Sequence, residues 1–487
     1  MLNMNKQNTK PLHAKLGKTF IGHISGWPLF LVLLISVNGI FLWIDHHPMF
    51  FLGDSASYIW TALTGWLPQD RSFIYGYFIR LVAVNTESLL SLVIAQVLLT
   101  CLVAIVLAHL LIRYFQVRPW FAFAVALLTS FEPLQLLYGR YVMTETLALA
   151  VFVFYIWLVI HYLEEPQIKW LVIIQCIATL MISIRFAFIP MAWICAPMIP
   201  IMAFSAIDAK ARLGGMKTIS RISLHVIMSI FMLFLFTTAY KHFHGYLQHK
   251  PPAYSYESGF FAMCYVLPIM DAGDFPDESI GHKVLHDSSF IYTDRRSRNA
   301  QHWLEGGAVD RLQKIEPDRM KAEAIASRAV FHTITRKPFL FLKLGWHTFT
   351  DYFDQSYLQD CINSDLGDRR LDAEFQAMLT THFHYPVDRS SALDLQTPTG
   401  RYFLHSGHWF QFLLFLPLWW CFLFIVMREG IQRRRVLLLC LISVICIGVT
   451  IFLVERITPR YLHIAAWLFF LMAGVGCNRF FADQNKL

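Results

Sequence analysis

Apolar blocks of roughly 17 to 25 residues recur along the chain, the length that an α-helix needs to cross a bilayer core. Of the 487 residues, 56% are hydrophobic and only 15% are charged, whereas soluble domains have about a quarter. The pattern therefore predicts a mostly α-helical, multi-pass membrane protein with about ten transmembrane helices. The expected spans are 27–45, 88–112, 119–137, 143–163, 169–184, 186–206, 219–240, 409–427, 436–454 and 461–480.

Lys and Arg gather in alternate connections between these spans. Such connections face the cytoplasm, which places both termini there and explains the net charge of +8 without nucleic-acid binding. The N-terminal run lacks a small-residue cleavage site and is interpreted as a retained signal anchor. We expect a multi-pass protein of a bacterial inner membrane. The basic residues are Lys6, Lys10, Lys15, Lys18, Arg113, Arg118, Lys169, Lys210, Arg212, Lys217, Arg221, Arg428, Arg433, Arg434 and Arg435.

Three modules follow from this topology. Residues 1–240 form an N-terminal transmembrane module with a first outer loop at 46–87, and residues 409–487 form a C-terminal one. Between them, 241–408 is predicted to be a folded, α-rich extracytoplasmic domain. Within it, Glu316-Pro317-Asp318 is typical of a helix start, and Arg336 precedes the Lys-Pro that ends that helix. The apolar stretch 339–353 is too short to span and favours an interfacial helix.

Cysteine and histidine spacing predicts no metal site. Cys264 and Cys361 are the two cysteines of the long polar segment, whereas most of the others lie inside apolar runs. They could pair if this segment faces an oxidising compartment. The histidines of that segment are interpreted as scattered surface residues, so a divalent metal ion is only weakly supported and the cofactor is unknown. They include His382, His384, His405 and His408.

The first outer loop carries a carboxylate just beyond the first span. Asp54 stands in Gly-Asp-Ser-Ala-Ser-Tyr, and the aromatic residues around it are typical of short helices lying at the headgroup level. Asp54 could reach a reacting group beside the bilayer. It could equally cap the helix that follows it, since Asp is a favoured N-cap residue. Arg71 lies further along the same loop.

Further charges lie at the ends of other spans. Glu145 opens the fourth span, where a charge is costly and usually paired, and Arg140 is a plausible partner. Arg185 interrupts a long apolar stretch, although it could simply mark a turn between two helices. Arg456 and Arg460 precede the last span.

These charges fall at one membrane face in the predicted topology. Clustered guanidinium groups suit a phosphate or pyrophosphate, which they bind in a bidentate manner. A lipid-linked phosphate lies at this depth in a bilayer. The converging residues are Asp54, Arg71, Arg140, Glu145, Arg185, Arg456 and Arg460.

The arrangement resembles the GT-C superfamily of membrane glycosyltransferases, which includes protein O-mannosyltransferases and aminoarabinose transferases. The likeness rests on Asp54 after the first span, on Met-Thr-Glu-Thr at Glu145 and on Ile-Arg-Phe at Arg185. Pro-Arg-Tyr at 459–461 and Arg-Lys-Pro-Phe-Leu at 336–340 add to it. It covers roughly residues 25–240 and 330–480. The chain departs from the family in having a single Asp54 for the usual Asp-Glu pair and no Lys-Pro-Pro loop motif.

The resemblance implies transfer of a sugar from a polyprenyl-phosphate donor to a lipid, glycan or protein acceptor at the outer face, with inversion. Asp54 would be the general base or position the acceptor, Glu145 would assist, and the arginines would hold the donor phosphate. The alternatives are a polymerase or ligase of lipid-linked glycans, a polytopic transporter, and a non-catalytic scaffold. A transporter usually shows internal repeats and charges near the midplane, and no repeat is evident here.

Overall fold

The computed structural model describes residues 26–51, 53–204, 215–286, 295–366, 371–385, 397–415 and 430–484. The charged connections at 6–18, 205–214 and 416–429 lie outside these ranges. Within the described ranges the chain is mostly α-helical, and the β pairing there is one parallel bridge between Met49 and Tyr141. This confirms the predicted helical fold class.

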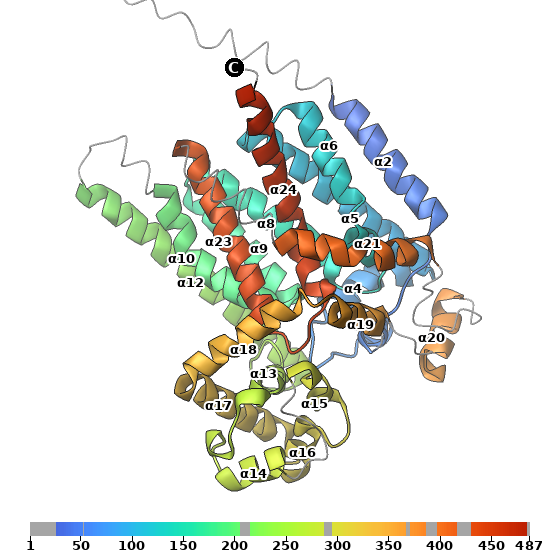
Figure 1. Cartoon of the computed structure of the whole chain (residues 1–487), viewed down its shortest axis with the longest axis vertical. Coiled ribbons are helices and arrows are strands. Elements are labelled where there is room, and N and C mark those ends of the chain that lie inside the picture. Colours follow the sequence, from blue (N-terminus) through green and yellow to red (C-terminus); the bar gives the residue numbers. More distant parts are fainter. Residues whose placement is uncertain are drawn as a thin grey trace, which may run out of the picture.

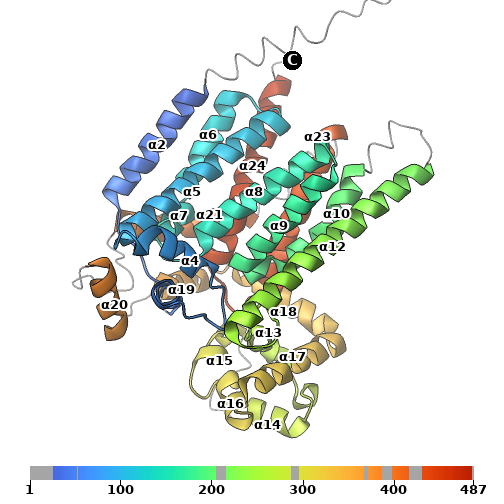
Figure 2. The ribbon, with the colours of Figure 1, turned by 180° about the vertical axis from the view of Figure 1, so that it is seen from behind.

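Long apolar helices form a bundle, which occupies the upper part of Figure 1 and whose helices run obliquely in that view. Both the start of α2 and the end of α24 lie at one end of the bundle, opposite a smaller group of helices (Figures 1 and 2). The bundle helices are α2 (Trp27–Ile44), α5 (Leu89–His109), α6 (Pro119–Ser130), α8 (Glu145–Glu164), α9 (Ile168–Ile184), α10 (Ile189–Phe204), α12 (Gly215–Gln248), α23 (Gly430–Phe452) and α24 (Pro459–Gln484).

Six stretches in the described part of the chain are long and apolar enough to cross a membrane. They are Trp27–Ile44, Leu89–Tyr114, Glu145–Glu164, Phe186–Phe204, Ile219–Gln248 and Arg434–Phe452. Three further predicted spans coincide with shorter apolar helices, at Pro119–Ser130, Ile168–Ile184 and His463–Asn478. The span predicted at 409–427 begins in α21 (Pro398–Phe415), and its remainder lies outside the described residues. Figure 1 shows α21 running across the other helices.

Burial differs sharply between the centre and the rim of the bundle. The largest cluster of buried residues joins α5, α8, α9, α10 and α24. By contrast, α2 exposes Leu29, Val32, Ile35 and Trp43 by 43% or more of their surface, although nearly every residue in it is apolar. A helix that is apolar all round but packed on one side only fits a lipid environment, where exposed hydrocarbon costs nothing.

A separate domain, here named the cap domain (residues 258–286 and 295–351), lies at the far end of the bundle (Figure 1). It has its own apolar core, which includes Phe260, Met263 and Leu312. The helix predicted to start near Asp318 is α17, because the Asp318 side chain accepts from the amides of Met320 and Lys321. The domain consists of α13 (Ser258–Val266), α14 (Glu278–His286), α15 (Ala300–Trp303), α16 (Ala308–Ile315), α17 (Arg319–Arg336) and α18 (Pro338–Asp351).

Helix α18 lies where the cap domain meets the bundle. Its Gly345 faces the Phe452 ring at the end of α23 so closely that an added Cβ would lie 2.0 Å from a ring carbon. On its other side Phe339 and Trp346 are 83% and 62% exposed. The 14-residue length agrees with the prediction that this stretch does not span.

The described parts of the segment 241–408 contribute to three separate cores. Its first residues belong to α12, which continues to Gln248 as a bundle helix. Leu358 and Phe403 join a core with the loop after α2, and Phe375 joins another with α3 and α4. The helices involved are α19 (Gln355–Leu366), α20 (Ala373–Phe383) and α21, with α3 (Asp54–Thr64) and α4 (Ile74–Ile79) from the first loop.

Cys264 and Cys361 form no disulfide with each other. Cys264 is buried in the core of the cap domain, whereas Cys361 lies in the core shared by α19 and α21. Packing against different elements keeps the two thiols in separate environments.

Candidate functional site

The Asp54 carboxylate is bound by two arginines, Arg71 and Arg460, which are far apart in the sequence. It is the first residue of α3, where the preceding Gly53 has a φ of +74° that a larger residue would adopt only with strain. Its Oδ1 accepts from Arg71 Nη1, and its Oδ2 accepts from Arg460 Nη1 at 2.8 Å. Both carboxylate oxygens are therefore occupied by guanidinium groups.

Glu145 provides the second carboxylate of the site. It opens α8, and its Oε1 accepts from Arg185 Nη1 at 2.6 Å and also from Arg460 Nε. Glu145 is fully buried, and its Oε2 finds no hydrogen-bond partner among the described residues. The prediction that a charge at this position would be paired is confirmed, but its predicted partner Arg140 is wrong.

The ion pairs join into one connected network, in the order Arg71, Asp54, Arg460, Glu145, Arg185. Asp54, Arg71 and Arg460 keep 15–17% of their side-chain surface exposed. Arg185 keeps only 7% and Glu145 none. The network therefore has an accessible edge and a buried interior.

The dipoles of the helices on which they lie stabilise most of these charges. Asp54 and Glu145 lie in the first turns of α3 and α8, and Arg185 directly follows the last turn of α9. Those positions match the helix dipole, whose N-terminal end is positive. Arg460 lies at the start of α24, where the dipole opposes a cation. Its two carboxylate partners therefore have to offset that cost as well as its desolvation.

Aromatic rings support the arginines. The Arg71 guanidinium lies 5.9 Å from the Tyr58 ring centre, and that of Arg185 lies 5.1 Å from the Tyr461 ring. Arg460 lies 5.2 Å from the Phe51 ring. Such contacts orient guanidinium groups without using their donors.

The electrostatics of Asp54 follow from these contacts. Burial raises the pKa of this carboxyl, but the charges of Arg71 and Arg460 outweigh burial and hold its pKa below the usual value. Asp54 is therefore ionised at neutral pH and, while both arginines hold it, has little affinity for a proton.

Two predicted phosphate ligands lie outside the network. Arg140 is buried and donates to the backbone oxygens of Asp45 at 3.1 Å and Leu136 at 3.3 Å, beside the Met49–Tyr141 bridge. It thereby fastens the loop after α2. Arg456 donates to the Cys361 carbonyl at 3.1 Å, which links the loop before α24 to α19.

Sequence reasoning missed two parts of the site. Asp70 binds Arg71, with Nε–Oδ2 at 2.8 Å, and the direct adjacency of the two residues was the available signal. Ser72 donates to the Ser183 carbonyl, which ties the first loop to the end of α9 near Arg185. Serines carry no comparable sequence signal, because they are common in loops.

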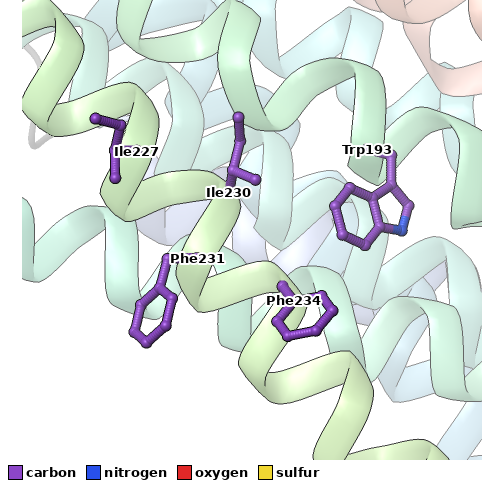
Figure 3. A pocket seen from close by; sticks show the side chains of 5 residues that line it. All are labelled: Trp193, Ile227, Ile230, Phe231 and Phe234. Carbon is purple, nitrogen blue, oxygen red and sulfur yellow. The ribbon is translucent and has the colours of Figure 1, made fainter.

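An apolar groove opens on the side of the bundle between α10 and α12. Its volume is about 340 Å³, and Figure 3 shows Trp193 from α10 facing a row of α12 side chains. On α12 the groove is lined by Ile227, Ile230, Phe231 and Phe234.

A row of aromatic rings runs from α12 to residues that neighbour the ion network in sequence. Tyr240, on α12 beyond Phe234, lies 6.3 Å from the Phe73 ring and 6.2 Å from the Tyr254 ring. Phe73 follows Ser72, and Tyr254 lies 6.2 Å from the Phe186 ring, next to Arg185. The row therefore runs from α12 to the residues next to Ser72 and Arg185.

The described residues contain no group of three or more His, Cys, Asp or Glu that could hold a metal ion. His384 instead lies 3.1 Å from Glu87, and His405 contacts the Arg401 carbonyl at 3.0 Å. The side chain of His408 lies outside the described part. Comparison with known proteins finds no family model and no curated relative that matches this sequence.

Proposed function

We propose that the protein is a membrane glycosyltransferase of the GT-C type, which transfers a sugar from a polyprenyl-phosphate donor to an acceptor at the outer membrane face. The observation that carries this proposal is the network in which Arg460 joins Asp54 to Glu145 at the end of a membrane bundle. Three guanidinium groups in a partly desolvated site suit the phosphate of a lipid headgroup.

The proposed orientation follows the basic connections. Both termini would be cytoplasmic, and the ion network and cap domain would lie at the extracytoplasmic face of a bacterial inner membrane. The donor headgroup would enter the network from the outer leaflet. The apolar groove at Trp193 offers a surface for part of the prenyl chain, because its α12 side chains are exposed. The aromatic row runs from the same helix to the residues beside Ser72 and Arg185.

The proposed reaction exchanges one bond at the anomeric carbon. An acceptor hydroxyl or amine attacks C1 as the bond from C1 to the phosphate oxygen breaks, and the electron pair leaves with the phosphate. Attack from the opposite face inverts C1. The negative charge that grows on the phosphate is stabilised by arginines already held in place. Asp54 would accept the acceptor's proton or position the acceptor.

The experiment uses the purified full chain in nanodiscs with radiolabelled polyprenyl-phosphate sugars and an envelope extract as acceptor. We expect transfer by the wild type and a loss of at least about 100-fold in Asp54→Asn, the range that general-base catalysis contributes. Asp354→Asn is the matched control, because this carboxylate pairs with Arg296 of the cap domain. Equal rates in wild type and Asp54→Asn would exclude the base role. Absence of prenyl-phosphate binding would overturn the function.

A further inference from the structure

The ion network is balanced in charge. Asp70, which pairs with Arg71, adds a third carboxylate to the five residues named above. Three arginines, Arg71, Arg185 and Arg460, then pair with Asp54, Asp70 and Glu145. A balanced network attracts an additional anion only weakly, because the guanidinium groups are already neutralised. A phosphate can bind strongly here only if one carboxylate gives up its arginines.

Arg71 and Arg460 each bind two carboxylates through different nitrogen atoms. Arg71 binds Asp70 through Nε and Nη2 and reaches Asp54 with Nη1. Arg460 binds Glu145 through Nε and also reaches Asp54 with Nη1. Asp70 and Glu145 therefore anchor the arginines, and the two Nη1 groups meet only at Asp54.

Exposure and hydrogen bonding together distinguish the carboxylate that can leave. Glu145 is fully buried, whereas the Asp54 and Asp70 side chains are 17% and 15% exposed. Asp70 is held by two donors of its sequence neighbour Arg71, which leaves Asp54 as the exposed carboxylate that bridges two arginines. If Asp54 moved aside, Arg71 and Arg460 would keep their anchors and the contacts with Tyr58 and Phe51. Two preoriented Nη1 groups would then face one empty position.

We propose that the donor phosphate binds between Arg71 and Arg460 by taking the place of the Asp54 carboxylate, which this exchange releases to act as the base. This inference rests on the proposed function. A phosphodiester carries one negative charge, so the exchange preserves the charge balance at the arginines. Asp54, freed of both guanidinium groups, regains the proton affinity that it lacks while they hold it.

The exchange requires the donor to bind before the acceptor is activated, and each bond that forms is matched by one that breaks. The donor binds first, and only then is a base available to the acceptor. As the acceptor oxygen bonds to C1, its proton passes to Asp54, and the electron pair of the broken C1–O bond stays on the phosphate. The products are the glycosylated acceptor, neutral Asp54 and a prenyl phosphate dianion held by two arginines. Without donor, Arg71 and Arg460 keep the Asp54 carboxylate bound. Asp54 then cannot accept a proton from water, so water is not activated as a nucleophile.

The test measures the affinity of the full chain in nanodiscs for farnesyl phosphate, with inorganic phosphate as a second probe. If the competing carboxylate leaves the site open only one-tenth of the time, Asp54→Asn should bind farnesyl phosphate about tenfold more tightly than the wild type. A residue that only supported the fold would weaken binding when replaced. Inorganic phosphate should follow the same trend if the headgroup alone is recognised, and fail to bind if the prenyl chain is required.

Asp70→Asn is the matched variant, because it removes the same charge from the same arginine. We expect it to weaken binding or leave it unchanged, since Arg71 loses its anchor. Equal tightening in both variants would mean that net charge alone matters and would overturn the exchange. If Asp54→Asn does not fold, the test depends on Asp70→Asn. Tighter binding of farnesyl phosphate by Asp70→Asn than by the wild type would then overturn the exchange. If the wild type binds farnesyl phosphate but folded Asp54→Asn binds no tighter, the exchange fails while the proposed function stands.

Discussion

Arg460 donates to Asp54 at 2.8 Å although 406 positions separate the two residues in the sequence. The contact joins the start of α24 to the start of α3, so the first loop is fixed by the last helix of the bundle. Arg460 also reaches Glu145 at the start of α8. One side chain therefore aligns three helix starts around a single site, and its removal should disturb both stability and function.

Glu145→Ala should be among the most destabilising single changes in the bundle. It leaves Arg185, only 7% exposed, without its carboxylate and removes one of the two partners of Arg460. Removing one member of a buried ion pair costs about 3–5 kcal/mol, because the remaining charge stays desolvated. Thermal unfolding in detergent should show a clear drop in midpoint. Glu278→Ala, at an exposed position in α14, should leave the midpoint unchanged, and an equal drop there would contradict the explanation.

The sequence predicted the six long apolar helices because their signal is local. Each long apolar block carries its own length and composition, and the start of α17 at Asp318 likewise depends on neighbouring residues. The convergence of Asp54, Arg71, Glu145, Arg185 and Arg460 was also predictable, because alternating spans place their charged ends at one face.

Side-chain partners could not be assigned in the same way. Arg140 was matched to Glu145 by sequence proximity, yet the turn after α7 (Pro133–Tyr138) directs it to the Asp45 and Leu136 carbonyls. Glu145 instead pairs with residues 40 and 315 positions away. Which long-range partner is in reach depends on helix rotation and packing, and a single sequence carries no signal for these.

Close packing of α3 on α4 should matter as much as the charges. A Cβ added to Gly76 would lie 2.4 Å from Thr61 Cγ2 and 3.1 Å from the Tyr58 carbonyl oxygen. Gly76→Ala should therefore push α3 aside, cost about 1–3 kcal/mol of unfolding free energy and lower sugar transfer, although no charged group changes. Unfolding and transfer assays on the variant test this.

Gly39→Ala in α2 is the control for Gly76→Ala, because an added Cβ there meets nothing within 4 Å. We expect wild-type transfer and stability for that variant. If Gly76→Ala behaves in the same way, tight contact between α3 and α4 does not position Asp54.

The pH dependence of the cap domain should reflect Asp274. Burial raises the pKa of this carboxyl, but Lys337 at 2.7 Å and Arg336 at 3.1 Å outweigh burial and hold its pKa below the usual value. A lowered folded-state pKa gives stability that is present above about pH 4 and is lost as the pH falls through the folded pKa. The stability difference between wild type and Asp274→Asn should therefore be constant from neutral pH down to about pH 5 and shrink below about pH 4. A difference that grows on acidification would contradict this sign.

Helix α18 should touch lipid through its exposed apolar side. Phe339 and Trp346 are 83% and 62% exposed, while Gly345 packs on the Phe452 ring at the end of α23. Interfacial helices lie at the membrane–water interface, where the amphipathic ring of Trp is favoured. In liposomes with brominated lipids, bromine quenches the emission of tryptophans that contact lipid. Trp346→Phe should therefore reduce the fraction of the tryptophan emission that these lipids quench. Trp303→Phe is the matched control, since Trp303 is 53% exposed on α15, in the body of the cap domain. Quenching that decreases equally in both variants would place the whole cap domain against lipid, and quenching that is unchanged in Trp346→Phe would place α18 in water.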